Sequence, residues 1–213
     1  IATKYAKRVC KFPYVFLTTN GSLAVPARVR HLMYAGLDSL KFSINFADNE
    51  QFKDICAVKP SLYEAALRNL KAARAVRDEI EAKTGHRCGL YASSIMYDGE
   101  QGKRMQKLLD EHVLPYVDEH YFLPLYSMGS FATQREEELG YRPIAGNQGR
   151  LGALRQPLPC WSTMTEGHIT SAGKLSACCF DATSAWEMAD LNKVSFMEGW
   201  NSDKFKELRK AHL

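Results

Sequence analysis

Two cysteines in the second half of the 213-residue chain are spaced like paired metal ligands. Twelve residues separate Cys160 from Gly173, and four more separate Gly173 from Cys178. Residues 163–174 predict a hairpin, with Gly167 and Gly173 at its turns, that would bring both thiols to one side. A shared iron cluster or zinc ion requires that arrangement. Free cysteines also pack as small apolar residues, so spacing alone leaves the ligand role and the core role equally open.

A third cysteine, Cys179, directly follows Cys178. Neighbouring side chains of a strand point to opposite faces, so the two cysteines are expected to have different roles. Cys178 is expected to bind metal, whereas Cys179 either fills the core or meets a substrate on the other side. His168 could be a further zinc ligand, but a histidine in a hairpin is more often a surface residue.

Polar residues also end two predicted strands in the first half of the chain. One strand ends in Thr19, Asn20 and Gly21, and the next carries Ser43 and Asn45. The carboxyl ends of parallel strands are where α/β proteins place ligand sites. Asn-Gly after a strand is also an ordinary turn, so this feature alone does not decide the function.

Strand and helix signals alternate four times along the first part of the chain. Ser61 and Glu64 have the spacing of a capping box, and glycines at 36 and 85 are suited to end helices. The predicted strands are 14–19, 40–46, 88–97 and 121–126, and the predicted helices are 26–36, 48–58, 61–85 and 101–113. This order predicts an α/β fold with parallel strands, either a partial (β/α) barrel or a doubly wound sheet.

The character of the sequence changes after Met128, where glycines and prolines replace periodic apolar runs. We expect three parts: the α/β region at 1–128, a linker or extended loop at 129–158, and a small cysteine-containing unit of β-hairpin and helix at 159–213. The chain begins with Ile1 rather than Met and stops at Leu213 inside an amphipathic stretch, which favours truncation at both ends.

Composition excludes several classes of function. The net charge is only +4 and the charges are scattered. The sequence shows no basic face interleaved with aromatic residues, so nucleic-acid binding is not predicted. No run approaches the roughly 18 apolar residues of a membrane span, and there is no N-terminal signal pattern. Six cysteines in a chain this long favour metal or redox chemistry in the cytoplasm over a disulfide scaffold.

Taken in order, these features resemble the radical S-adenosylmethionine (SAM) superfamily, in its subgroup with a SPASM-type auxiliary domain. The strand ending in Thr-Asn-Gly, the helix ending near Gly36 and the strand carrying Ser43 look like the central barrel. The spaced pair Cys160 and Cys178, followed by Cys-Phe-Asp, looks like the start of the auxiliary domain. The tail from Asp190 to Arg209 is similar to the stretch that follows in that domain.

The resemblance implies roles for individual residues. It implies [4Fe–4S] clusters and SAM as cofactors, with Cys160 and Cys178 as ligands of an auxiliary cluster. Thr19, Asn20 and Ser43 would contact SAM, with Ser43 at its ribose. Leu125 and Tyr126 would meet the adenine through their backbone. The position after Cys178 is often a catalytic carboxylate in relatives; here it is Cys179, with Asp181 two residues on, so these two are the candidates for exchange of a proton or hydrogen with substrate.

The chain also departs from the family pattern. It lacks the Cys-x3-Cys-x2-Cys loop that holds the SAM-cleaving cluster and the glycine-glycine-glutamate stretch that contacts the methionine part of SAM. The resemblance therefore implies a fragment of an enzyme that takes hydrogen from an unknown substrate, such as a peptide or a glycan, with an external electron donor such as a flavodoxin or ferredoxin. The fragment alone is expected to be inactive, and its first strand could pair in a dimer. The alternative is a non-catalytic α/β domain with a structural zinc or iron–sulfur site.

Overall fold

A computed structural model describes residues 2–56, 59–127, 133–138, 144–145, 160–181 and 185–212. The chain divides into two units, at 1–123 and 124–213, which are treated separately below. Of the helices in these described ranges, none combines the length and the apolar character needed to cross a bilayer.

The first unit is built on a parallel sheet with the strand order β1-β2-β3-β4. The strands are β1 (Phe16–Thr19), β2 (Ser39–Ser43), β3 (Gly89–Ile95) and β4 (Glu119–Leu123). Ser43 pairs in register with Ser93, and Ser93 pairs with Tyr121. All carboxyl ends therefore lie along one edge of the sheet, and the expected α/β fold with parallel strands is confirmed.

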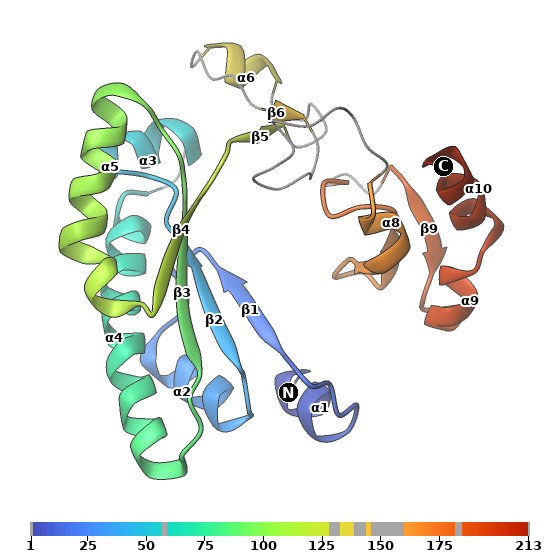
Figure 1. The fold of residues 1–213 in the computed structure, drawn as a ribbon, viewed down its shortest axis with the longest axis horizontal. Helices are drawn as coiled ribbons and strands as arrows, with labels where there is room; N and C mark the ends of the chain where they lie inside the picture. The colour runs from blue at the N-terminus through green and yellow to red at the C-terminus, as the bar shows by residue number, and fades with distance from the viewer. Residues whose placement is uncertain are drawn as a thin grey trace. The chain divides into compact units, whose positions relative to one another are not determined.

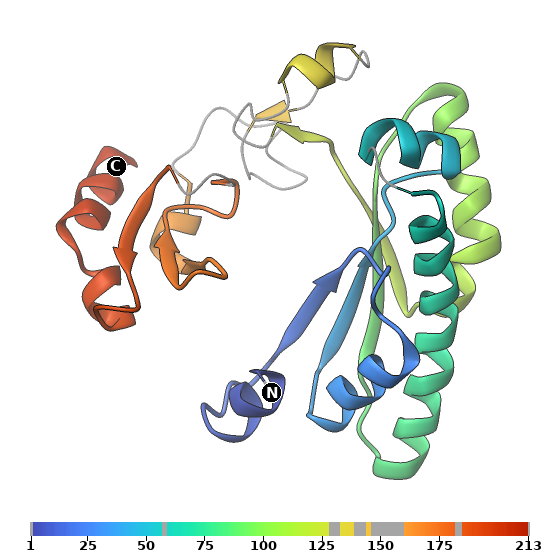
Figure 2. The ribbon, with the colours of Figure 1, turned by 180° about the vertical axis from the view of Figure 1, so that it is seen from behind.

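Helices connect the strands and cover one face of this sheet (Figures 1 and 2). The helices of the unit are α1 (Ala2–Arg8), α2 (Pro26–Tyr34), α3 (Asn49–Cys56), α4 (Ser61–Thr84), α5 (Gly99–His112) and the short 3-10 helix η1 (Leu114–Tyr116). The glycine after α2 has φ +91° and the one after α4 has φ +71°, as the left-handed end of a helix requires.

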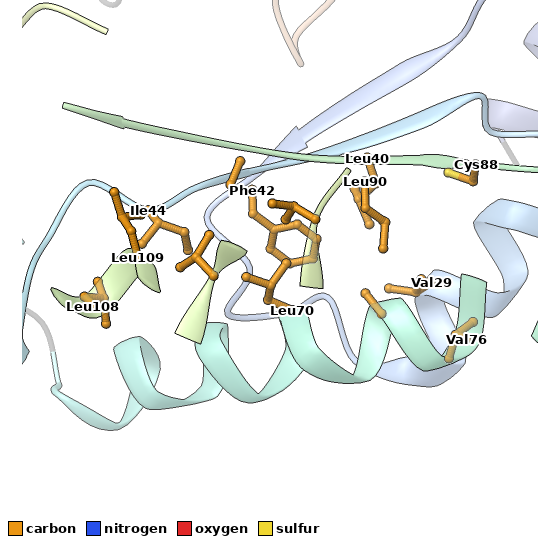
Figure 3. Close-up of a cluster of buried hydrophobic side chains, with 14 of the residues drawn as sticks. Val29, Leu40, Phe42, Ile44, Leu70, Val76, Cys88, Leu90, Leu108 and Leu109 are labelled. Carbon is orange, nitrogen blue, oxygen red and sulfur yellow. The ribbon is translucent and has the colours of Figure 1, made fainter. Parts of the chain in front are cut away.

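The core fills the space between the sheet and these helices (Figure 3). Phe42 and Leu90 point from the strands toward Leu70 on α4, and all three are fully buried. Alternate residues of the same strands, such as Lys41 and Tyr91, face the other side of the sheet and are only partly buried. Cys88 belongs to this core, and burial raises the pKa of its thiol to about 12, so it packs as a small apolar residue.

Two aspartates brace the amino ends of the strands. The carboxylate of Asp38 accepts a hydrogen bond from the Val15 N–H at 2.6 Å, and that of Asp118 accepts one from the Leu90 N–H at 2.8 Å. Asp118 also pairs at 2.9 Å with Arg77, whose side chain is almost wholly buried. These stabilising charges thus lie at the amino edge of the sheet. The opposite edge, where the strands have their carboxyl ends, is left for ligands.

Several element boundaries differ from the sequence-based prediction. The strand expected at 40–46 ends at Ser43, although the Ile44 N–H still donates to the Ser93 carbonyl at 2.8 Å and the apolar alternation continues. The capping box expected at Ser61 is wrong: Pro60 takes the N-cap position, no side-chain cap forms, and the Tyr63 N–H bonds to the Pro60 carbonyl. Proline holds φ near its helical value, so it moves the start of α4 back by one residue.

The second unit holds a three-stranded antiparallel sheet with the order β7-β8-β9. These strands are β7 (His168–Ile169), β8 (Lys174–Ser176) and β9 (Glu187–Asp190), and the helices beside them are α8 (Ser162–Thr165), α9 (Phe196–Trp200) and α10 (Asp203–His212). Leu175 and Phe205 are fully buried at the centre of this unit. Arg209 lies 4.2 Å from the ring of Trp200 and donates to the Thr163 carbonyl, which ties α10 to α8.

The stretch expected to be a linker contains a helix and a strand among its described residues. Strand β5 (Tyr126–Ser127) pairs in parallel with β6 (Ile144–Ala145), and α6 (Thr133–Glu138) lies between them in the sequence. The remaining positions of 129–158 lie outside the described residues.

Candidate functional site

The turn after β1 is held by its own side chains. The Thr19 hydroxyl accepts from the Gly21 N–H at 3.1 Å, and the Asn20 side chain accepts from the Ser22 N–H at 3.1 Å. Gly21 has φ +80°, and a β-carbon there would lie 3.0 Å from the Phe42 ring. Only glycine fits both the conformation and the space, so this position fixes the path of the chain past the end of β1.

Helix α4 anchors this turn. The side-chain amide of Asn69 donates to the carbonyl oxygens of Gly21 at 2.8 Å and of Ser22 at 3.1 Å. Asn69 is 8% exposed, so these bonds are made away from competing water. Asn20 is thereby presented at the carboxyl edge of the sheet.

The loop after β2 is held at three points. The Tyr97 hydroxyl donates to the Asn45 carbonyl at 3.0 Å, and the Tyr63 hydroxyl donates to the Ala47 carbonyl at 3.1 Å. Burial, together with the charge of Asp48, raises the pKa of the Tyr63 phenol, so it remains a donor. Asp48 in turn bonds to Arg104 on α5 at 2.8 Å.

Between these two loops lies a pocket of about 360 Å³. One part of its wall is polar and the other is apolar and aromatic. The lining residues are Asn20, Ser22, Ser43, Ile44, Asn45, Phe46, Phe52, Leu62, Tyr63 and Ala66. The structure thus brings Asn20 and Ser43 together in one pocket at the carboxyl ends of β1 and β2. Thr19 serves the turn and is absent from this lining set.

Leu125 and Tyr126 belong to the second unit. Leu125 lies between β4 and β5 and is partly buried, and the Tyr126 backbone pairs with Ile144. The Tyr126 side chain lies outside the described residues. Their role at an adenine ring therefore stays a prediction.

The three cysteines of the second unit lie on either side of β7 and β8. Cys160 precedes α8, and its carbonyl accepts a hydrogen bond from the Thr163 hydroxyl at 3.0 Å. Cys178 follows β8, and its sulfur accepts from the Phe180 N–H at 3.4 Å. Both thiols are partly exposed. Backbone donors to a cysteine sulfur are the contacts that stabilise a thiolate in an iron–sulfur site.

The hairpin in this unit is shorter than predicted. Residues 162–165 are helical, and the hairpin runs from His168 to Ser176 with Gly173, at φ +75°, in its turn. Cys178 and Cys179 therefore lie in a turn after β8 rather than in a strand, and the alternation of faces does not apply to them. Cys179 is exposed, but partial desolvation of its sulfur and the neighbouring Cys178 raise the pKa of its thiol to about 11.

Asp181 braces the connection from β8 to β9. Its carboxylate accepts hydrogen bonds from the Ser176 hydroxyl at 2.8 Å, the Ala185 N–H at 2.9 Å and the Trp186 N–H at 3.0 Å. Three donors give this side chain a positioning role close to the cysteines. A role for Cys179 or Asp181 in hydrogen exchange with substrate stays a prediction.

The donor set fits an iron–sulfur group by its chemistry. Cysteine thiolates are the usual ligands of such clusters, and Cys160 and Cys178 are accessible enough to bind one. Within the part of the chain that the structure describes, no group of three histidine, cysteine, aspartate or glutamate side chains is gathered to hold a metal ion. These two cysteines would thus supply part of a ligand set.

Sequence reasoning missed the residues that position the site. Asn69, Tyr63 and Tyr97 hold the two loops, yet each lies in a stretch whose pattern predicts only a helix or a strand. A polar residue on the buried face of α4 was the available signal for Asn69, because such a residue must find a hydrogen-bond partner.

Comparison with known proteins bears on both units. Residues 160–213 match the SPASM family, described as an iron–sulfur cluster-binding domain. No curated protein matches the chain in sequence. The solved structure of native anSMEcpe with bound AdoMet is similar to the chain, with a TM-score of 0.56, 14% identity, and coverage of 94% of this chain and 60% of that one. A histidine-tagged form of anSMEcpe with bound AdoMet gives a TM-score of 0.46 and 14% identity over 93% of this chain and 57% of that one.

The first likeness extends over most of the chain, and at this identity it shows the fold alone. The chain spans 60% of that protein's length. The partial barrel expected from the sequence agrees with this fold, and the matched family agrees with the expected auxiliary domain.

Proposed function

We propose that the chain, whose residues 160–213 match the SPASM family and whose fold is similar to that of anSMEcpe, is part of an enzyme that takes a hydrogen atom from its substrate. One observation carries the proposal. A SPASM domain follows, in the same chain, a parallel sheet whose carboxyl edge gathers Asn20 and Ser43 in one pocket. Neither feature alone would indicate this chemistry.

In this proposal the polar part of the pocket at the carboxyl edge of the sheet holds the ribose of SAM. The Ser43 hydroxyl is suited to a ribose hydroxyl, and the Asn20 amide can donate a further hydrogen bond at the pocket wall. Reductive cleavage of bound SAM by one electron would supply methionine and a 5′-deoxyadenosyl radical, which becomes 5′-deoxyadenosine on taking hydrogen from the substrate. The turn held by Asn69 and the loop held by Tyr97 keep both groups in place for this.

The second unit would hold an auxiliary cluster. Cys160 and Cys178 provide thiolates, and the Phe180 N–H stabilises the sulfur of Cys178. Cys179, hydrogen-bonded to Cys178, is the candidate to exchange a proton or hydrogen with the substrate, and Asp181 fixes the turn that carries it. The electron for SAM cleavage would come from an external donor such as a flavodoxin or ferredoxin.

A second function also has support. The SPASM match alone is compatible with a non-catalytic protein in which a metal site at Cys160 and Cys178 serves structure or binding. The pocket at Asn20 and Ser43 favours the enzyme, because a structural protein does not require a ligand site at the carboxyl edge of its sheet.

The test is SAM cleavage by the protein that the complete coding sequence specifies. After anaerobic reconstitution with iron and sulfide, a reductant and SAM should yield 5′-deoxyadenosine, and Ser43→Ala should lower the yield while cluster content is unchanged. The 213-residue chain, which has no Cys-x3-Cys-x2-Cys loop, should yield none above background. A complete protein that binds iron but never forms 5′-deoxyadenosine would favour the non-catalytic alternative.

A further inference from the structure

We infer that the apolar half of the pocket at the carboxyl edge binds an uncharged aromatic group of the substrate. The inference rests on the proposed function in one respect, because that function brings the substrate to this edge. The half in question consists of Phe46, Phe52 and Tyr63, named here the aromatic wall, with Leu62 beside it.

The aromatic wall is one continuous surface drawn from three elements. The rings of Phe46 and Phe52 meet edge to face with centroids 5.2 Å apart, and those of Phe52 and Tyr63 lie 5.7 Å apart. Aromatic rings favour offset and edge-to-face partners, so a further ring can join such a set. The Tyr63 hydroxyl is already bonded to the Ala47 carbonyl, and the wall therefore offers mainly apolar surface.

The lining of the pocket carries no charge. None of its ten lining residues is acidic, basic or a histidine. The nearby ions Asp48 and Arg104 are paired with each other at 2.8 Å. A charged ligand group would lose water here without gaining a counter-ion, which disfavours carboxylates, phosphates and ammonium groups.

The size of the pocket suits a ring with a linker. An apolar cavity of about 150 Å³ is enough to bind benzene, and this pocket has about 360 Å³. The proposed function gives Asn20 and Ser43 to SAM, so Ser22 and Asn45 are the polar lining residues suited to bond to atoms that attach the ring to the rest of the substrate.

The pocket is also preformed. The loop that carries Phe46 is fixed by the bond from Tyr97 to the Asn45 carbonyl, and by the Ala47 N–H, which donates to the buried Gln51 side chain at 2.7 Å. A preformed site binds with little loss of side-chain freedom, so a small neutral aromatic molecule should bind without the rest of the substrate.

The experiment compares three fluorinated probes by fluorine NMR on the full chain. These are neutral 4-fluorophenol, anionic 4-fluorobenzoate and cationic 4-fluorobenzylammonium. We expect 4-fluorophenol to bind with a dissociation constant of roughly 1 mM, as suits a molecule of this size. Both ions should bind at least about tenfold more weakly because their charge would be desolvated. Stronger binding of either ion would overturn the inference, as would no binding of 4-fluorophenol.

Two matched variants test the location. Leu62 is 39% exposed and lines the pocket, whereas Leu114 is 41% exposed and does not. Leu62→Asp should weaken 4-fluorophenol binding by about tenfold or more, because it places a carboxylate beside the aromatic wall. Leu114→Asp should leave the binding unchanged. Equal affinity in the two variants would contradict the assigned site, provided that circular dichroism shows both to be folded.

The readouts separate this inference from the proposed function. Probe binding is measured without SAM, cluster or turnover. If 4-fluorophenol binds as expected and the complete protein forms no 5′-deoxyadenosine, the proposed function fails and the aromatic site remains. If the complete protein cleaves SAM but the probe does not bind, only the inference fails.

Discussion

Asn69 reaches from α4 to the turn after β1 and donates a 2.8 Å hydrogen bond to the carbonyl of Gly21. The two residues are 48 positions apart in sequence. This bond joins the longest helix of the first unit to the turn that presents Asn20. The pocket therefore depends on a buried amide that is not itself a lining residue but also bonds to one, through the Ser22 carbonyl at 3.1 Å.

Replacing this amide should loosen the turn. Asn69→Ala leaves two carbonyl groups without their donor, and we expect the free energy of unfolding to fall by about 1–3 kcal/mol in urea denaturation. Asn201 also donates to one carbonyl, at 2.9 Å, but at an exposed position. Asn201→Ala is the matched control and should cost well under about 1 kcal/mol. Similar losses in both variants would show that Asn69 does not act as an anchor.

The glycine in the turn should be intolerant of a side chain. Gly21 and Gly85 both have positive φ, at +80° and +71°, so alanine is strained at either position. A β-carbon at Gly21 would meet Phe42 and Ala66, whereas at Gly85 it would meet nothing within 4 Å. We expect Gly21→Ala to destabilise the chain by about 1–3 kcal/mol more than Gly85→Ala. Equal thermal shifts would contradict the crowding at Gly21.

The brace at the amino edge should depend on pH. Burial alone would raise the pKa of Asp118, but the Leu90 N–H and Arg77 outweigh it and hold the pKa below its usual value. The contribution to stability is therefore complete above the unfolded pKa of about 3.9 and is lost as the pH falls through the lower folded value. Asp118→Asn should cost about 2 kcal/mol at pH 7 and progressively less in acid, as measured by urea denaturation at each pH. A cost that stays constant into strong acid would contradict this.

The order of elements in the first unit could be predicted from the sequence because it depends on local signals. Pro26 opens α2, glycines end α2 and α4, and apolar runs mark the strands. The exact ends of the strands and helices were harder to predict. The alternation at Leu40 continues through Ile44, which lies beyond the end of β2 but is buried and still donates its N–H to the Ser93 carbonyl, so the pattern does not mark where the strand ends.

Of the candidate site, only the residues at the strand ends could be predicted from the sequence. Asn20 and Ser43 follow from where parallel strands stop, but their anchors depend on contacts across the fold, such as Asn69 with Gly21 and Tyr97 with Asn45. The different roles of Cys178 and Cys179 were argued from strand geometry, and both residues lie in a turn. This turn is held by the carboxylate of Asp181, which accepts from the Ala185 and Trp186 N–H groups, and the alternation of a strand carries no signal for such bonds.

The neighbouring cysteines should still differ in metal binding. The sulfur of Cys178 accepts the Phe180 N–H, a contact suited to a cluster ligand, whereas partial desolvation and the neighbouring Cys178 raise the pKa of the exposed Cys179 thiol. We expect Cys179→Ser to retain its iron after anaerobic reconstitution and to lose turnover in the complete protein. Unchanged turnover would assign Cys179 to packing, and loss of iron would make it a ligand.

The account depends most on an iron–sulfur site in the second unit, and the iron content of reconstituted single-cysteine variants tests it directly. Cys160→Ser and Cys178→Ser should each lose most of the iron and the visible absorption that the parent chain gains. Cys10→Ser, which removes an exposed thiol in the first unit, should lose neither. Equal iron in all three variants and the parent would contradict the assignment of Cys160 and Cys178 as ligands.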